Sequence, residues 1–142
     1  MLYLSGIHAL NTNCLLNTTG DWHSSALKWD VVNQRLIDSK NSIFEDYGIE
    51  VDKDIPFANK DKKYNVANHI RACLDLLSEG KFAELQGMRK DFICTDEYDN
   101  EIFEKVCLLK DQSNWQEIDD FMEKEYMLKW LNYKKKRGVV NQ

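Results

Sequence analysis

Four side chains capable of acid–base, nucleophilic or metal-binding chemistry lie close together near the start of the sequence. His8, Cys14, Asp21 and His23 fall within 16 residues. In an extended segment Asp21 and His23 point to the same side, because side chains alternate along a strand. A carboxylate beside an imidazole orients a general base or a metal ligand. With His8 on a neighbouring strand, the sequence allows a small enzyme or ligand-binding domain with its site at His8, Asp21 and His23.

Ordinary structural roles also explain these residues. An Asp that follows Gly in a turn commonly hydrogen bonds its own backbone, and a His beside a Trp commonly packs against it. The sequence lacks the GxSxG, P-loop, GxGxxG and HExxH motifs and the paired-cysteine motif of zinc deaminases. We therefore keep the enzymatic site as the alternative, and we expect neither a cofactor nor a metal. His69 is expected at the rim of a helix face.

The four cysteines indicate reduced thiols, not a disulfide or zinc framework. Cys14, Cys73, Cys94 and Cys107 include no CxxC pair, so neither a zinc knuckle nor a dithiol redox motif is predicted. Cys73 and Cys107 fall within helical patterns and are expected to be small buried hydrophobes. The N-terminal residues lack the basic start of a secretory signal, and no apolar run approaches the roughly 20 residues of a membrane span. We expect a cytoplasmic protein that does not bind membranes.

Charge is distributed unevenly along the 142 residues. Residues 1–44 are neutral, residues 45–127 carry 21 acids and 11 bases, and residues 128–142 carry five bases and no acid, for a net charge of −5. The acidic middle would repel phosphates, which argues against general nucleic-acid binding. The exception is the basic run from Lys134 to Arg137, which could contact phosphates but equally suits the C-terminal end of a helix.

The second half of the sequence predicts helices. Apolar residues recur at helical spacing between residues 66 and 78, with Asn65 as the expected N-cap and with Arg71 and Asp75 pointing the other way. By the same reasoning we expect helices over residues 66–78, 81–93 and 99–109.

The last predicted helix runs without a break from Ser113 or Asn114 to Arg137. Its apolar residues form one face (Trp115, Ile118, Met122, Tyr126, Trp130, Tyr133) and a second patch roughly opposite (Phe121, Leu128, Leu131). A helix on the surface of a small domain needs only one apolar face. The second patch therefore indicates central packing between neighbouring helices, which we favour, or a contact with another chain. A homodimer through this helix is the second of these alternatives.

The first half predicts strands and loops. Branched and aromatic residues favour strands over 2–10, 24–32 and 35–37 and an extended segment over 48–51. Residues 42–48 are expected to form a short helix. The charged segment 52–63, which holds the only proline, is expected to be the loop between two halves.

Together these patterns predict an α+β fold, with a small N-terminal antiparallel β-sheet or hairpin followed by a bundle of three to four α-helices. We expect a single domain over residues 1–142, with a β-rich half over 1–56, a helical half over 64–137 and a tail over 138–142.

The charge pattern favours a small acidic partner-binding protein. Acidic residues gather over 96–104 and 117–125, and such a field steers a protein toward a basic partner surface. The same acids would also serve an ordinary solvated surface. We expect an inhibitor that occludes a basic protein or nucleoprotein surface: an antitoxin, an immunity protein or a phage-type anti-defence protein. The expected partner contacts are Asp119, Asp120, Glu123, Trp130 and Tyr133.

Overall fold

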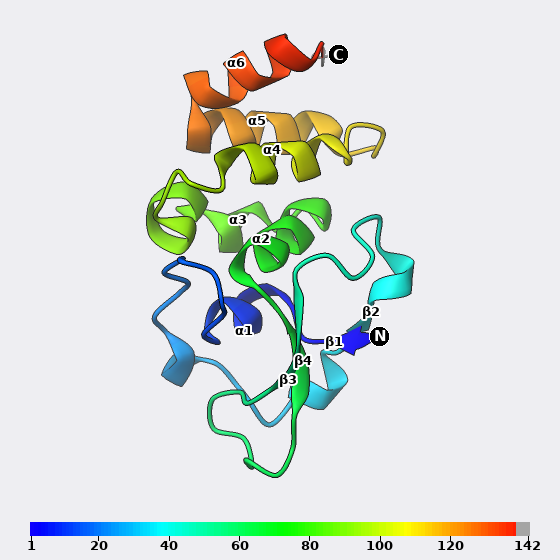
Figure 1. Ribbon diagram of the computed structural model, residues 1–142, viewed down its shortest axis with the longest axis vertical. Helices are drawn as coiled ribbons and strands as arrows, with labels where there is room; N and C mark the ends of the chain where they lie inside the picture. The colour runs from blue at the N-terminus through cyan, green and yellow to red at the C-terminus, as the bar shows by residue number, and fades with distance from the viewer. Residues whose placement is uncertain (139–142) are drawn as a thin grey trace.

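The chain folds as an α+β protein whose elements are stacked along one long axis. The structure, a computed structural model, describes residues 1–138. Short strands lie toward one end, the central helix α2 (His69–Ser78) lies in the middle, and three helices stack at the other end: α4 (Asp99–Cys107), α5 (Trp115–Tyr126) and α6 (Leu128–Arg137) (Figure 1). The predicted class, a small antiparallel sheet followed by helices, is confirmed.

Two short antiparallel strand pairs make up the β-structure of the described residues. β1 (Leu2–Tyr3) pairs with β2 (Ile37–Asp38), and β3 (Ile49–Lys53) pairs with β4 (Tyr64–Ala67). A parallel bridge between Leu4 and Val66 connects the two pairs. The charged loop expected between two halves therefore joins the two strands of one hairpin.

Most of the strand predicted over residues 2–10 is helical. The extended segment stops at Tyr3, and Gly6–Leu10 forms the short helix α1. Residues 24–32 and 42–48 also differ from expectation, because the first holds the 3₁₀ turn η1 (Ser24–Ala26) and the second is a run of turns. Strand propensity mainly reflects packing beside another strand. Neither 2–10 nor 24–32 gains such a partner along its length among the described residues.

Two further 3₁₀ turns complete the first half. They are η2 (Val32–Gln34) and η3 (Ser39–Asn41), which flank β2. Val32 and Ser39 are the buried residues of these turns.

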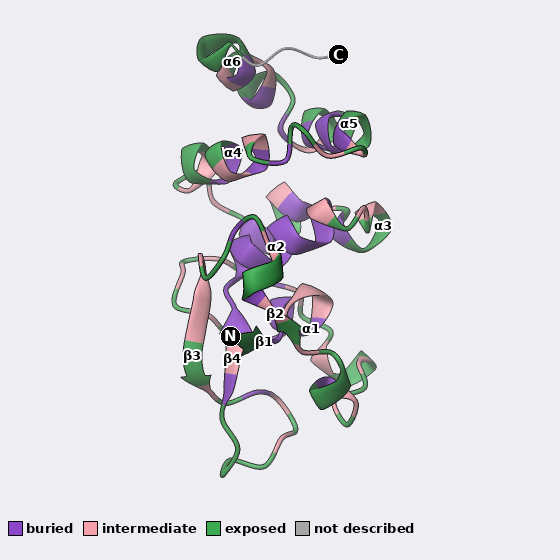
Figure 2. Ribbon diagram, turned by 90° about the vertical axis from the view of Figure 1, so that its right-hand side faces the viewer, coloured by how far each residue is buried: buried purple, intermediate pink, exposed green. Residues whose placement is uncertain are grey.

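Helix α2 is the centre of the fold. Every residue from His69 to Leu77 is buried (Figure 2). Its N-cap is Asn68, not Asn65, because the Asn68 side chain accepts a hydrogen bond from the Arg71 backbone N–H at 2.8 Å. Asn65 belongs to β4 instead, so the predicted helix 66–78 begins three residues too early.

The expected outward orientation of Arg71 and Asp75 is wrong. Arg71 is 0% exposed, and its Nε donates to Asp75 Oδ1 at 3.0 Å. Its Nη1 donates to the backbone carbonyls of Glu45 and Tyr47 at 2.7 and 2.6 Å. These contacts satisfy a charge that would be very costly to bury unpaired.

The same ion pair also holds the N-terminal strand. Asp75 Oδ2 accepts hydrogen bonds from the hydroxyls of Tyr3 and Ser5 at 2.7 and 2.6 Å. The backbone passes so close to the helix at Gly48 that a Cβ there would lie 2.8 Å from Arg71 Cβ, and the φ of Gly48 is +73°. Glycine is therefore required where the turn before β3 meets the helix.

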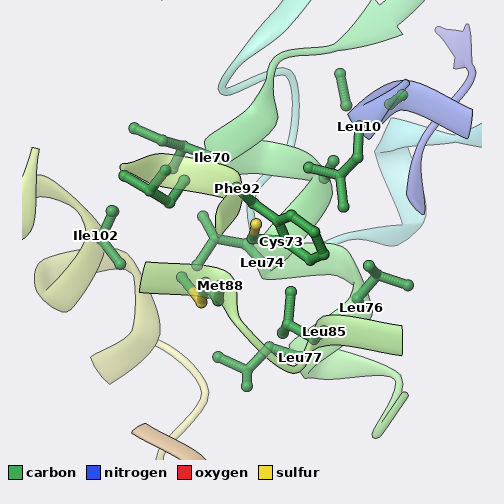
Figure 3. Packing of buried hydrophobic residues seen from close by; sticks show 14 of the residues in the cluster. Leu10, Ile70, Cys73, Leu74, Leu76, Leu77, Leu85, Met88, Phe92 and Ile102 are labelled. Carbon is green, nitrogen blue, oxygen red and sulfur yellow. The ribbon is translucent and has the colours of Figure 1, made fainter. Parts of the chain in front are cut away.

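The main apolar core lies between α2 and the segments that follow it. Cys73 and Leu74 of α2 gather with Met88 and Phe92 of the π-helical segment η4 (Met88–Ile93) and with Ile102 of α4 (Figure 3). Burial of Cys73 confirms its predicted role as a small hydrophobe. Cys107 packs against the core but is only partly buried.

The helix predicted over residues 81–93 is interrupted at Gly87. Helix α3 (Phe82–Leu85) ends before it and η4 begins after it, and Gly87 has a φ of +88°. A carboxylate from α5 fixes the start of η4, because Glu125 accepts hydrogen bonds from the backbone N–H groups of Gly87 and Arg89 at 3.3 and 3.1 Å. Glu125 therefore has a structural role.

The long last helix of the prediction is two helices, because the backbone turns at Met127, where φ is 52° and ψ is −129°. α5 and α6 then pack against each other (Figure 1). Asp119 of α5 accepts hydrogen bonds from Trp130 Nε1 at 2.8 Å and from Lys134 Nζ at 2.7 Å, both on α6. Much of the expected aromatic face is thus buried between helices of the same chain. The second patch is not buried as a whole, because Phe121 is 8% exposed but Leu128 is 69% exposed.

We predict that Asp75→Ala lowers the free energy of unfolding by about 3–5 kcal/mol, because it leaves the Arg71 guanidinium buried without its carboxylate. Urea denaturation followed by circular dichroism measures the loss. The control is Glu79→Ala on the exposed side of the same helix end, which should change stability by no more than about 0.5 kcal/mol. Equal effects of the two substitutions would contradict the assigned role of the ion pair.

We also predict that Met127→Gly stabilises the protein by about 1 kcal/mol. A positive φ is strained for any residue with a Cβ and not for glycine, and the Met127 side chain is 55% exposed. Met127→Ala is the matched control, because it removes the same side chain but keeps the Cβ. A gain in melting temperature with alanine as large as with glycine would show that the backbone at Met127 is not strained.

Candidate functional site

The polar loop over residues 11–20 lies at the junction of the fold. Its backbone N–H groups donate to side chains and carbonyls of elements far away in the sequence: Leu15 to Glu50 of β3 at 2.8 Å, and Gly20 to the Phe92 carbonyl of η4 at 2.8 Å. Asn17 donates to the hydroxyl of Tyr98, just before α4, at 2.9 Å. The loop is therefore held in one position by three separate segments.

Cys14, Thr18 and His69 form a hydrogen-bonded cluster where this loop meets the N-terminus of α2. Cys14 Sγ lies 3.4 Å from Thr18 Oγ1, and Thr18 Oγ1 lies 2.7 Å from His69 Nδ1. Thr18 therefore links the thiol to the imidazole of His69, the first residue of α2. His69 is 3% exposed, so the expectation that it lies at a helix rim is wrong.

The second ring nitrogen of His69 fixes the direction of these hydrogen bonds. Nε2 lies 2.8 Å from the Thr12 carbonyl oxygen, and a carbonyl oxygen only accepts. Nε2 is therefore protonated, and in the neutral ring Nδ1 is the acceptor. A proton on Cys14 can pass to Nδ1 through the Thr18 hydroxyl, which leaves a thiolate and an imidazolium at the two ends of the cluster.

The environment favours this charged pair. Burial raises the pKa of Cys14, but hydrogen bonds from His69 and Thr18 outweigh it and lower that pKa to about 7. Burial lowers the pKa of His69, whereas its hydrogen bond to Cys14 and the charge of the thiolate raise it above its usual value. The N-terminal end of α2 also favours an anion at Cys14.

His69 borders a cavity of about 230 Å³ that is also lined by residues of the loop. Asn11, Asp21, Trp22 and Pro56 contribute to its walls. A cavity lined by a buried imidazole, a carboxylate and an amide is suited to a small polar molecule. We find this cavity adjacent to the thiol cluster, not around it, because Cys14 is not among the lining residues.

The structure brings together two of the three residues of the alternative site. His23 Nδ1 lies 2.6 Å from Asp21 Oδ1, and Asn11 Nδ2 donates to Asp21 Oδ2 at 3.1 Å. Asn11 Oδ1 also accepts from the His23 backbone N–H at 2.8 Å. The pair is therefore held by an amide that sequence reasoning did not consider, and His23 is 75% exposed along its side chain.

His8, the third residue of the alternative site, instead contacts Lys28 and Trp29. Its Nε2 is 2.9 Å from the Lys28 carbonyl oxygen, and its ring meets that of Trp29 edge to face at 5.0 Å. No hydrogen bond within residues 1–138 links His8 to Asp21 or His23. His8 therefore has a packing role, whereas His23, the His beside Trp22 in the sequence, has an exposed side chain.

The expected partner contacts on the last two helices divide into buried and accessible residues. Asp119 and Trp130 are 2% and 0% exposed, so they are excluded as surface contacts. Their burial follows from the turn at Met127, which folds Trp130 and Lys134 onto Asp119. Tyr133 is partly buried, with its ring 6.4 Å from Trp130 and stacked on it.

Asp120 and Glu123 keep their accessible positions on the outer face of α5. Glu117, one turn earlier, is exposed on the same face. None of these three carboxylates is in an ion pair among the described residues. The accessible acidic face of α5 is therefore smaller than the sequence cluster 117–125 suggested.

Comparisons with family models, with curated proteins and with solved structures give no match. Within residues 1–138 no group of three or more His, Cys, Asp or Glu side chains is arranged to hold a metal ion. In the same residues no helix is both long and apolar enough to cross a membrane.

We predict that Gly20→Ala lowers the free energy of unfolding by about 2 kcal/mol or more. A Cβ at Gly20 would lie 2.5 Å from the Leu10 carbonyl oxygen and 2.7 Å from His69 Cε1, and the φ is +75°. Gly138→Ala is the control, because its φ is +69° but nothing lies within 4 Å of the added methyl. It should cost only the backbone strain of about 1 kcal/mol. Chemical denaturation of both variants tests the difference, and equal losses would contradict the close approach to His69.

Proposed function

We propose that the chain is a partner-binding protein that inhibits its target by occluding a basic protein or nucleoprotein surface. The observation that carries the proposal is the outer face of α5, where Glu117, Asp120 and Glu123 are exposed and not paired with a cation among the described residues. Such a protein would act in the cytoplasm as an antitoxin, an immunity protein or a phage-type anti-defence protein.

The second acidic cluster, over residues 96–104, contributes less to this face. Glu101 of α4 accepts a hydrogen bond from the hydroxyl of Tyr47, which lies in the turn before β3. Helix α5 contacts a different part of the fold, because its Phe121 ring stacks on that of Phe82 in α3. Figure 2 shows α4 and α5 on different sides of the stack. Asp99 in addition pairs with Lys129 at 3.0 Å. The two clusters are therefore separate surfaces, and α5 is the better candidate for the contact.

The proposal explains how charge contributes to binding. Exposed charges at the edge of an interface mainly raise the association rate and its dependence on salt, while buried contacts set the dissociation rate. At about 0.15 M ionic strength the field extends roughly 8 Å. The α5 carboxylates would thus guide a basic partner onto this side of the molecule.

Nucleic-acid binding through the basic run from Lys134 to Arg137 has less support. Lys134 is 3% exposed and pairs with Asp119 at 2.7 Å, which removes it from any phosphate contact. Lys135, Lys136 and Arg137 occupy the last turn of α6, where cations complement the helix dipole. The expected tail over 138–142 lies almost entirely outside the described residues.

The alternative is that a second copy of this chain binds at this end of the molecule and forms a homodimer. Leu128 is 69% exposed at the turn between α5 and α6, and a second copy could cover it. Light scattering of the purified protein distinguishes a self-association from capture of a different partner.

We predict that the double substitution Asp120→Lys and Glu123→Lys abolishes capture of a stoichiometric partner from native lysate at about 0.05–0.15 M salt. The matched control is Glu97→Lys with Glu104→Lys, which makes the same charge change near α4. Pull-down with mass spectrometry is the measurement, and circular dichroism confirms that both variants fold. The control should retain the partner.

Partner retention by the α5 variant, or equal loss from both variants, would contradict a specific contact through α5. Absence of any partner would favour the alternative function, a ligand-binding or enzymatic domain. Its remaining support is the Asp21–His23 pair near the cavity bordered by His69.

A further inference from the structure

We propose that Cys14 is a site of covalent modification, at which a thiolate attacks small hydroperoxides while Thr18 and His69 hold the displaced proton. The proposal is independent of partner binding through α5. It rests on the hydrogen-bonded arrangement of the thiol, the Thr18 hydroxyl and the buried imidazole of His69 in the first turn of α2.

The other cysteines lack this arrangement. Cys73 is fully buried in the core, and burial raises its pKa. Cys107 is partly buried, and burial also raises its pKa. Cys94 is exposed, but no hydrogen bond to its thiol is found among the described residues. Cys14 is therefore the one cysteine of residues 1–138 that combines partial accessibility with partners for a thiolate.

The proposed step is a two-electron oxidation of sulfur. The Cys14 thiolate attacks one oxygen of the hydroperoxide, an S–O bond forms, and the O–O bond breaks. The leaving alkoxide or hydroxide takes the proton held on His69 Nδ1 and departs as an alcohol or water. Cys14 becomes a sulfenic acid, and His69 returns to its neutral form.

Charged and titratable groups of neighbouring elements also face the cluster of Cys14, Thr18 and His69. Glu50 of β3 adds a favourable charge for protonated His69 and is itself bonded to Lys53 at 2.5 Å. Tyr98 accepts a hydrogen bond from the Asn17 backbone N–H of the loop. The carboxylate of Glu97, the preceding residue, is a negative charge on that side and opposes a thiolate. Lys53 also donates to the Asn13 carbonyl next to the thiol.

The position of Cys14 gives the modification a structural consequence. Thr18 and Cys14 hold the loop 11–20 against the N-terminus of α2, and an added oxygen atom must fit between them. Sulfenic acid formation should therefore loosen the loop contacts with η4 and β3.

The test measures the reactivity of each cysteine in the full-length native protein. Iodoacetamide labelling followed by peptide mass spectrometry gives the rate at Cys14 and Cys94 as a function of pH. Cys14 should reach half its maximal rate near pH 7, below the pH at which an ordinary thiol does so. At pH 6.5 Cys14 has a larger thiolate fraction than an ordinary thiol, although each thiolate is a weaker nucleophile, and we expect it to react about fivefold faster.

Three variants distinguish an effect of the cluster on Cys14 reactivity from an effect on folding. Thr18→Val and His69→Gln should each move the half-maximal pH of Cys14 upward by about one unit. Thr19→Val is the matched control, because Thr19 is the adjacent exposed threonine outside the cluster. The internal reference is Cys94, whose rate should not change in any variant. If His69→Gln fails to fold, Thr18→Val carries the test alone.

A second arm tests the peroxide reaction itself. After treatment with hydrogen peroxide, dimedone should add to Cys14 and not to Cys94, and Thr18→Val should reduce the adduct severalfold. Equal labelling of Cys14 and Cys94 at pH 6.5, an unchanged pH profile in folded Thr18→Val, or no dimedone adduct at Cys14 would each overturn the proposal.

Discussion

The buried Arg71–Asp75 ion pair is the interaction on which the rest of the structure depends. A guanidinium with no exposed surface must have its charge balanced and its donors satisfied. Asp75 supplies the charge, while the carbonyls of the turn before β3 and the hydroxyl of Tyr3 supply acceptors. One side chain of the central helix thereby fixes the N-terminal strand and the turn, which lie far apart in the sequence. Buried ion pairs add little stability over apolar packing, but removal of one partner is severe.

A second constraint operates at the N-terminus of the same helix, where His69 meets the loop 11–20. The loop 11–20 is polar and irregular, yet its backbone groups are bonded to β3, η4 and the segment before α4. Because the loop is fixed, Cys14 and Thr18 stay in contact with His69. The ordered loop keeps the Cys14 thiol within hydrogen-bond distance of Thr18 and Thr18 within that distance of His69, since a mobile loop would exchange these hydrogen bonds for bonds to water.

The turn at Met127 decides which acids and aromatics can reach another molecule. In one continuous helix Asp119 and Trp130 lie three turns apart. With the chain folded back, they bond to each other and to Lys134 inside the protein. The acidic face is reduced to Glu117, Asp120 and Glu123, and the aromatic residues become core. A surface inferred from helical periodicity is therefore valid only up to the point where the helix ends.

The sequence by itself determined the α+β class, the approximate extent of the helical segments of the second half, and the burial of Cys73. These follow from periodicity and composition, which act locally. It also paired Asp21 with His23, two residues apart. It failed where the partner is distant: Arg71 was assigned to the surface because its acceptors lie 24 and 26 positions away.

Only the tertiary structure decided the contents of the candidate sites. His69 meets Thr18 across 51 positions of sequence, and no spacing rule connects such residues. The apolar segments 2–10 and 24–32 favoured strands by composition, but strand formation needs a neighbouring strand that the fold does not provide there. In the second half local pattern thus fixes which segments are helical, whereas contacts across the fold decide the form of the first half and which polar groups are buried and paired.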